Sequence, residues 1–98
     1  MKFTVIIHED VHGEIKSEYK HLDSCQTGLG DLFIAEYAET LRILENLALA
    51  SPIRRKDYRH IPIGRFSLLL IYQVIGNEVH IKRIIHTARK PNSRYRKL

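Results

Sequence analysis

The sequence predicts an α+β fold, in which a helical hairpin packs on one face of a small, largely antiparallel sheet in the order β-α-α-β-β-β. Two observations lead to this prediction. Apolar residues over 10–50 recur every three or four positions, which is the period of an amphipathic helix. Residues 58–86 instead contain apolar, β-branched runs joined by a Gly-Asn dipeptide, as in a hairpin. Ninety-eight residues, 44% of them hydrophobic, support one domain over residues 1–98.

The first half begins with a strand and a helix. Residues 3–7 are β-branched and aromatic and long enough for one strand. Asp10 is placed to cap the following helix, which Gly13 weakens near its start. One face of this helix is expected to carry Val11, Ile15, Tyr19 and Leu22.

A break with two glycines, residues 24–30, precedes a second helix. Asp31 is expected to cap this helix, which runs to about Ala50 before Ser51-Pro52 ends it. Its apolar face is expected to carry Phe33, Tyr37, Leu41, Leu44 and Ala48. Two amphipathic helices with so short a connection form an antiparallel pair.

Three strands are expected in the second half, after a basic loop at residues 54–56. Residues 58–63 form a short strand that Pro62 confines to a sheet edge. Residues 66–74 are almost wholly apolar, which is typical of a central strand, and residues 79–86 return beside them. A polar, basic tail follows over residues 87–98.

The two-residue turn at Gly76-Asn77 sets the hairpin register and places Arg83 on the face that the helices cover. Either its guanidinium escapes at the end of the sheet, or a β-bulge near Ile84-Ile85 turns it outward, which we favour. The other face is half apolar and half basic and is not expected to be a buried core. Basic side chains then converge at one end of the sheet: Arg65, Arg83, His86 and Arg89.

Charge divides unevenly along the chain. Residues 1–53 contain four Lys and Arg against nine Asp and Glu, a net charge of −5, whereas residues 54–98 contain twelve against two, a net charge of +10. This asymmetry predicts an anionic partner, either nucleic acid or an acidic protein segment. The alternative is that the two halves face each other and neutralise within the fold.

His86 is the candidate for proton transfer, because a histidine with an ordinary pKa of about 6.5 exchanges protons near neutrality. Beside Arg65 and Arg83 it could help to cleave a phosphodiester, with arginine stabilising charge on phosphorus. The alternative is that His86 only caps the strand end by hydrogen bonding. Partner or nucleic-acid contacts are expected from Arg54, Arg55, Lys56, Arg59, Arg89 and Lys90.

Other classes of function are not expected. Cys25 is alone, so no intramolecular disulfide can form, which fits a reducing cytoplasm. His8 and His12 straddle the first strand-to-helix junction without paired carboxylates, so no metal site is expected, and no cofactor is expected either. The N-terminus does not read as a secretory signal, and no apolar run approaches the roughly 20 residues of a membrane span.

Four motifs in series resemble the RelE/ParE toxin superfamily across essentially the whole chain. Val79 to Arg89 is similar to its C-terminal signature, V-x-I-x-R-(V/I)-(L/I)-H-x-A-R. Arg65 to Val74 resembles the strand R-F-P-Y-L-x-F-Y-x-V. Gly28-Leu29-Gly30-Asp31 with Phe33 resembles the G-L-G-x-x-F opening of the second helix, and Ser51-Pro52 the break after it. The family fold has the same β-α-α-β-β-β order.

The resemblance implies a toxin of a type II toxin–antitoxin system, of the plasmid-stabilisation type, that a cognate antitoxin with an acidic segment neutralises. RelE-type members cut mRNA on the ribosome without a metal, whereas ParE-type members act against DNA gyrase. The nuclease branch typically has arginine three residues before the central-strand tyrosine, and Leu69 stands there. The His-x-Ala-Arg ending favours ParE. The leading hypothesis is a ParE-like growth inhibitor; the alternatives are a ribosome-dependent mRNA endonuclease and an orphan or inactive relative.

Overall fold

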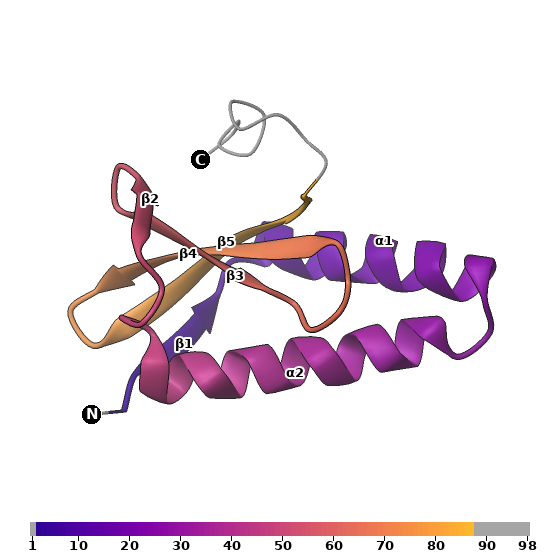
Figure 1. Cartoon of the computed structure of the whole chain (residues 1–98), viewed down its shortest axis with the longest axis horizontal. Helices are drawn as coiled ribbons and strands as arrows, with labels where there is room; N and C mark the ends of the chain where they lie inside the picture. The colour runs from indigo at the N-terminus through magenta and orange to yellow at the C-terminus, as the bar shows by residue number, and fades with distance from the viewer. Residues whose placement is uncertain (1, 88–98) are drawn as a thin grey trace.

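A computed structural model describes residues 2–87 and places two helices against a five-stranded mixed sheet (Figure 1). The strand order is β1-β5-β4-β3-β2; β1 runs parallel to β5, and the other neighbours are antiparallel. The elements are β1 (Thr4–Ile7), α1 (Glu9–Cys25), α2 (Leu29–Leu47), β2 (Ile53–Arg55), β3 (Tyr58–Pro62), β4 (Leu68–Ile75) and β5 (Glu78–His86). The predicted α+β fold is confirmed, with one strand more than expected.

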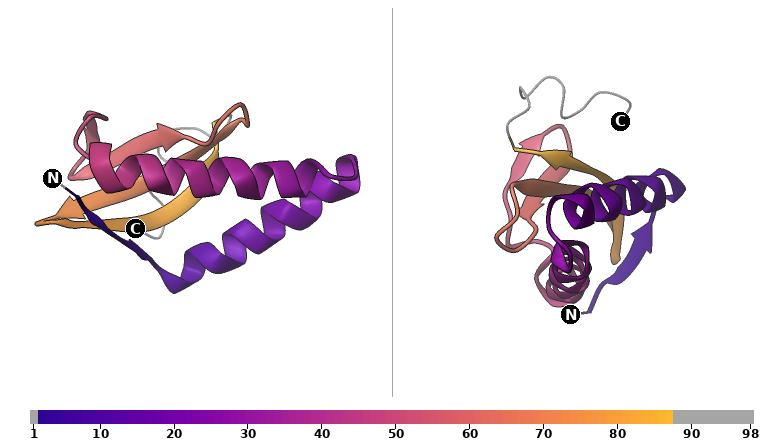
Figure 2. Two further views of the ribbon diagram at one scale, coloured as in Figure 1. Left: turned by 90° about the horizontal axis from the view of Figure 1, so that it is seen from below. Right: turned by 90° about the vertical axis from the view of Figure 1, so that its right-hand side faces the viewer.

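The core lies between the helix pair and one face of the sheet. Figure 2 shows both helices on the same side of the sheet, with α2 running beneath the strands, and α1 packs against β5. The apolar face predicted for the second helix is confirmed, since Phe33, Leu44 and Ala48 are fully buried and Tyr37 and Leu41 pack against them. In β4, Tyr72 is also fully buried, and its hydroxyl donates to the carbonyl oxygen of Ala48 at 2.7 Å.

Both predicted helix caps are wrong. His8, not Asp10, is the N-cap of α1, because the helix begins directly after β1 and leaves Glu9 and Asp10 in its first turn, near the positive end of the helix dipole. The N-cap of α2 is Gly28, not Asp31. Here Asp23 of α1 takes over the capping role, since its Oδ1 accepts from the backbone N–H groups of Gly28 and Gly30 at 3.0 and 3.2 Å.

Steric constraints explain why both outer positions of the G-L-G motif, Gly28 and Gly30, are glycines. Gly28 has a left-handed backbone with φ of 92°, which glycine adopts without the clash of a Cβ atom. At Gly30 the two helices approach so closely that a Cβ atom would lie 2.8 Å from the carbonyl oxygen of Tyr19. The motif therefore sets both the turn between α1 and α2 and their contact.

A strand, β2, lies where a loop was predicted for residues 54–56. It pairs antiparallel with β3 through Ile53 opposite Arg59 and Arg55 opposite Tyr58. Consequently β3 is not the edge strand of the sheet. Pro62 pairs with β4 but lies beyond the short β2, so the proline remains at a position where no described strand needs its missing N–H.

The hairpin of β4 and β5 has the predicted turn and the predicted register as far as Tyr72 opposite Ile81. A bulge at Lys82 then places Arg83 opposite Ile71, so the expected bulge exists, two to three residues earlier than predicted. It moves Arg83 off the core face and puts Ile84 there. Ile71 and Ile85 lie on the other face and are nevertheless buried, which corrects the prediction for that face.

Candidate functional site

The end of β5 is held by carboxylates of α1. Strand β1 accompanies β5 only as far as Ile81, so among the described residues no strand neighbours the backbone of β5 beyond that point on this side. Glu14 fills the gap: its Oε1 accepts the backbone N–H of Ile84 at 2.8 Å, and its Oε2 lies 3.4 Å from Nε of Arg83. One side chain thus satisfies the strand edge and balances a guanidinium that is only 16% exposed.

Glu18, one helical turn further along α1, holds His86. Its Oε1 lies 2.7 Å from Nε2 of His86, which donates when the carboxylate is ionised. The second oxygen of Glu18 is buried and has no hydrogen-bond partner in the described part of the chain. The expected proton-transfer residue is therefore engaged by a carboxylate through one of its two ring nitrogens.

Arg65 belongs to the same end of the sheet by backbone position but turns toward the other helix. The N–H of Thr87 donates to the carbonyl oxygen of Ser67, which brings the loop that carries Arg65 beside the end of β5. Its guanidinium, 77% exposed, lies 4.0 Å from Glu36 of α2. An ion pair this exposed contributes about 0–1 kcal/mol. The three predicted catalytic side chains thus each meet a helix carboxylate; Arg89 and Lys90 lie outside the described residues.

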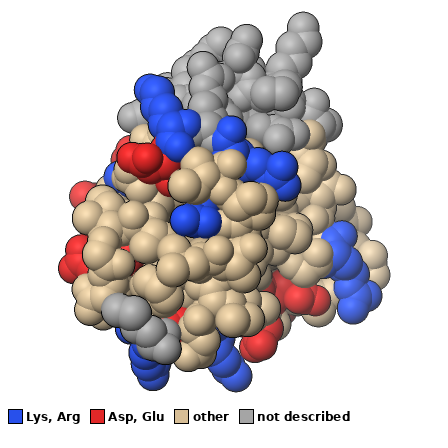
Figure 3. All heavy atoms as spheres, turned by 60° about the vertical axis from the view of Figure 1, so that its left-hand side comes forward, with Lys and Arg blue, Asp and Glu red and all other residues tan. Residues whose placement is uncertain are grey.

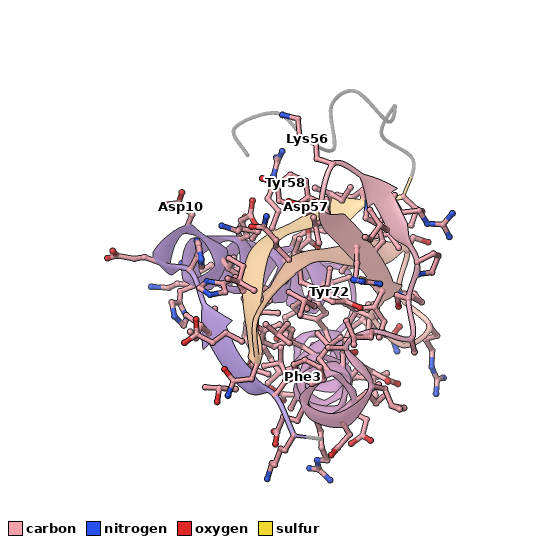
Figure 4. The ribbon with its side chains drawn as sticks, turned by 90° about the vertical axis from the view of Figure 1, so that its left-hand side faces the viewer. Phe3, Asp10, Lys56, Asp57, Tyr58 and Tyr72 are labelled. Atoms are coloured by element: carbon pink, nitrogen blue, oxygen red, sulfur yellow. The ribbon has the colours of Figure 1, made fainter. Side chains whose placement is uncertain are left out.

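The predicted binding residues near β2 differ in what surrounds them. Arg54 and Lys56 are exposed, and Figure 4 shows Lys56 at the tip of the turn between β2 and β3, away from the core. Arg59 instead donates to the carbonyl oxygens of Ser51 and Leu49, so it holds the segment that leaves α2. The side chain of Arg55 is not among those that the structure describes.

Exposed apolar side chains gather at this end of the molecule. Leu47 and Leu49 at the end of α2 are each 58% exposed, Ile53 of β2 is 53% exposed, and Ile75 at the hairpin is 50% exposed. We call these four residues the apolar end. Figure 3 shows the corresponding side as largely uncharged, with Lys and Arg side chains near its centre and in its upper part and an acidic patch at its upper left. Apolar surface with a charged rim is typical of a protein-binding surface.

A histidine pair that the sequence analysis did not single out lies on the opposite face of the sheet. Nε2 of His8 lies 3.1 Å from Nδ1 of His80, and Nε2 of His80 lies 3.0 Å from Oε1 of Glu78. Burial lowers the pKa of His8 most, followed by the charges of Lys82 and His80, while Asp10 opposes them. Only the parallel pairing of β1 with β5 brings the pair together, and local sequence carries no signal for that pairing.

The described part of the chain has neither a metal-binding cluster nor a membrane-spanning helix. Within residues 2–87, no three His, Cys, Asp or Glu side chains are grouped so that they could hold a metal ion. Over the same residues, no helix is both long enough and apolar enough to cross a membrane.

Comparison with known proteins gives one informative result. No protein-family model matches the sequence, and no curated protein matches it. Among solved structures, the chain is similar to one described as the chromosomal ParDE TA system from P. aeruginosa, with a TM-score of 0.75 and 16% sequence identity over 87% of this chain and 96% of that one. The resemblance to ParE that the motifs indicated is confirmed at the level of the fold.

Proposed function

We propose that this chain is the toxin of a type II toxin–antitoxin system, a ParE-like inhibitor of bacterial growth. The observation that carries the proposal is the fold: a TM-score of 0.75 to a chain of a ParDE system that is covered over 96% of its length, with the four family motifs in their expected order along this sequence. In this proposal the protein acts in the cytoplasm, on DNA gyrase, and helps to stabilise a plasmid.

Two local features favour binding over RNA cleavage. Glu18 engages His86 through Nε2, and Glu14 engages Arg83, so both side chains already have structural partners. Where nuclease relatives typically have arginine, Leu69 stands in an apolar row between Pro62 of β3 and Ile85 of β5. This row offers no charge to a scissile phosphate. The alternative function, ribosome-dependent mRNA cleavage, would have to use the basic residues that remain.

The antitoxin is proposed to contact the apolar end and the basic residues beside it. Exposed Leu47, Leu49 and Ile53 would take the apolar side of an amphipathic segment, and Arg54 and Lys56 would take its carboxylates. On its outer side, β2 has no neighbour among the described strands, so an extended segment can also add to the sheet there. This surface would use part of the excess positive charge of the second half of the chain.

The test is expression of the chain in bacteria with and without a co-expressed antitoxin candidate, a short reading frame beside its gene with an acidic C-terminal half. We expect growth arrest that the candidate relieves, with a DNA-damage response before any loss of mRNA. Codon-phased mRNA cleavage in ribosome-containing extracts, with gyrase supercoiling unaffected, would favour the nuclease. No effect on growth, and no such neighbouring frame, would favour an inactive relative.

His86→Gln separates the two active functions. In a nuclease it should lower the cleavage rate roughly 100-fold or more, the scale for loss of a general acid or base. In a non-catalytic toxin it should hardly change toxicity, because glutamine can still donate to Glu18, and this is the result we expect. The matched control is His21→Gln, at an exposed histidine of α1. A toxicity loss confined to His86→Gln would reverse the ranking.

A further inference from the structure

The hydrogen-bond chain from His8 to His80 to Glu78 fixes where its protons lie. Glu78, when ionised, accepts from Nε2 of His80, so in a neutral ring the other nitrogen of His80, Nδ1, carries a lone pair. That lone pair accepts the N–H at Nε2 of His8 across 3.1 Å. When both rings are neutral, the two imidazoles are therefore joined by one hydrogen bond.

The pair can bind one additional proton but not a second without losing its contact. With one extra proton, His80 becomes an imidazolium that donates from Nδ1, and the neutral ring of His8 accepts at Nε2. A second proton places an N–H against an N–H and a positive charge against a positive charge. Neither nitrogen of the His8–His80 contact can then accept a hydrogen bond, and the two imidazolium rings repel each other.

The surroundings neutralise a doubly charged pair only in part. From β5, Lys82 adds a positive charge and Glu78 a negative one; α1 contributes Asp10. From β4, His80 faces the uncharged Gln73. The net effect lowers the pKa of His8, mostly through burial. A lowered pKa means that the stability contributed by neutral His8 is complete above about pH 6.5, the ordinary value, and is lost as the pH falls toward the folded-state pKa.

The backbone around His8 shows what the pair holds in place. His8 directly follows β1 and is the N-cap of α1, and its N–H donates to the carbonyl oxygen of Ile81 at 3.2 Å. The other end of β1 is held independently, because Phe3 is buried and its N–H donates to the carbonyl oxygen of Glu45. Loss of the histidine contact would release only one end of the strand.

We propose that His8 and His80 form a proton-operated latch between β1 and β5, and that protonation of both rings frees the His8 end of β1. The backbone of β5 beside Ile81, now paired with β1, would become an open strand edge able to pair with another chain. The proposal concerns residues on the face of the sheet opposite the helices and does not depend on the toxin function.

The experiment is hydrogen exchange of single amides, followed by NMR at about pH 7.5 and about pH 5, on either side of the ordinary histidine pKa. Rates are expressed as protection factors, which removes the intrinsic pH dependence of exchange. The His8 amide reports on the latched end, and the Thr4 amide, which donates to the carbonyl oxygen of Asn77, on the other end of β1.

We expect protection at His8 to fall about tenfold or more relative to Thr4, the factor that Coulomb's law at the dielectric constant of water gives for two unit charges this close. His80→Gln, which cannot take the second charge, should abolish the fall, and exposed His21→Gln should retain it. If the His80→Gln variant does not fold, the His8→Asn variant takes its place. The protection factor of the Thr4 amide is then compared with those of the β5 amides next to Ile81. An equal fall at both amides, no fall, or a fall that survives the substitution overturns the proposal.

Discussion

Replacement of Glu14 by alanine should destabilise the protein by about 3 kcal/mol. The substitution leaves the N–H of Ile84 without its 2.8 Å acceptor, and a part-buried hydrogen bond to a charged group contributes about 1.5–3 kcal/mol. It also removes the partner of Arg83; since these side chains remain 16% and 29% exposed, we assign that loss only about 1 kcal/mol. Alanine favours helices, so the loss does not come from α1 itself.

Two variants separate the parts of this effect. Glu14→Gln keeps a carbonyl oxygen for Ile84 but loses the ion pair and the charge on that acceptor, so it should cost about 1–2 kcal/mol. Glu39→Ala is the control, because Glu39 lies 3.7 Å from Arg42 in a pair that is 73% and 54% exposed, and it should cost less than about 0.5 kcal/mol.

Urea denaturation followed by circular dichroism measures the free energy of unfolding of each variant, with midpoints compared at a common slope. Thermal unfolding should agree, with a decrease of roughly 12 °C or more in the midpoint for Glu14→Ala in a domain of this size. If Glu14→Ala and Glu39→Ala cost the same, the carboxylate of α1 does not stabilise the edge of β5. If Glu14→Gln costs as much as the alanine variant, charge and not the backbone contact is the cause.

Further predictions concern two glycines and the basic residues beside the apolar end. Gly13→Ala should stabilise the protein by about 0.5–1 kcal/mol, because nothing lies within 4 Å of the added Cβ. Gly30→Ala should destabilise it by about 1–3 kcal/mol, because the added Cβ would lie 2.8 Å from a backbone oxygen of α1. Chemical denaturation of both variants measures the two changes in the free energy of unfolding, and changes of the same sign would contradict the prediction. The double variant Arg54→Glu, Lys56→Glu should slow antitoxin association more than it speeds dissociation. Antitoxin binding to the wild-type protein should weaken between about 50 and about 200 mM salt. Stopped-flow kinetics measures both effects, with Lys20→Glu as the control, and binding that does not depend on salt would count against the prediction.

Local sequence predicted the parts of the fold whose signals are local. The helices show in apolar residues at helical spacing, and the hairpin shows in the Gly76-Asn77 turn, whose register holds for its first four pairs. Strand β2 has no such signal, because its three residues are extended only through pairing with β3. The predicted cap of α2 failed for a similar reason, because Asp23 reaches the start of α2 from another helix.

The candidate site could be predicted only in part, because its side chains find partners far along the chain. The sequence places His86 at the end of β5, but Glu18 lies 68 residues away. The four-residue spacing of Glu14 and Glu18 puts both on one helix face, yet which strand that face meets depends on the path from β1 into α1. The pairing of His8 with His80 depends equally on the parallel contact of β1 with β5.

The division of charge along the chain has a different outcome at each end of the sheet. Where β5 ends, carboxylates of α1 meet Arg83 and His86, so the acidic first half partly neutralises the basic second half there. At β2, no carboxylate of the described residues forms an ion pair with Arg54 or Lys56, and exposed apolar side chains lie close by. Positive charge balanced inside the fold adds little to the attraction of an acidic segment, because the segment would have to displace the carboxylate already present. An acidic partner should therefore approach the β2 end first, and charge reversal there should slow binding more than the same change beside β5.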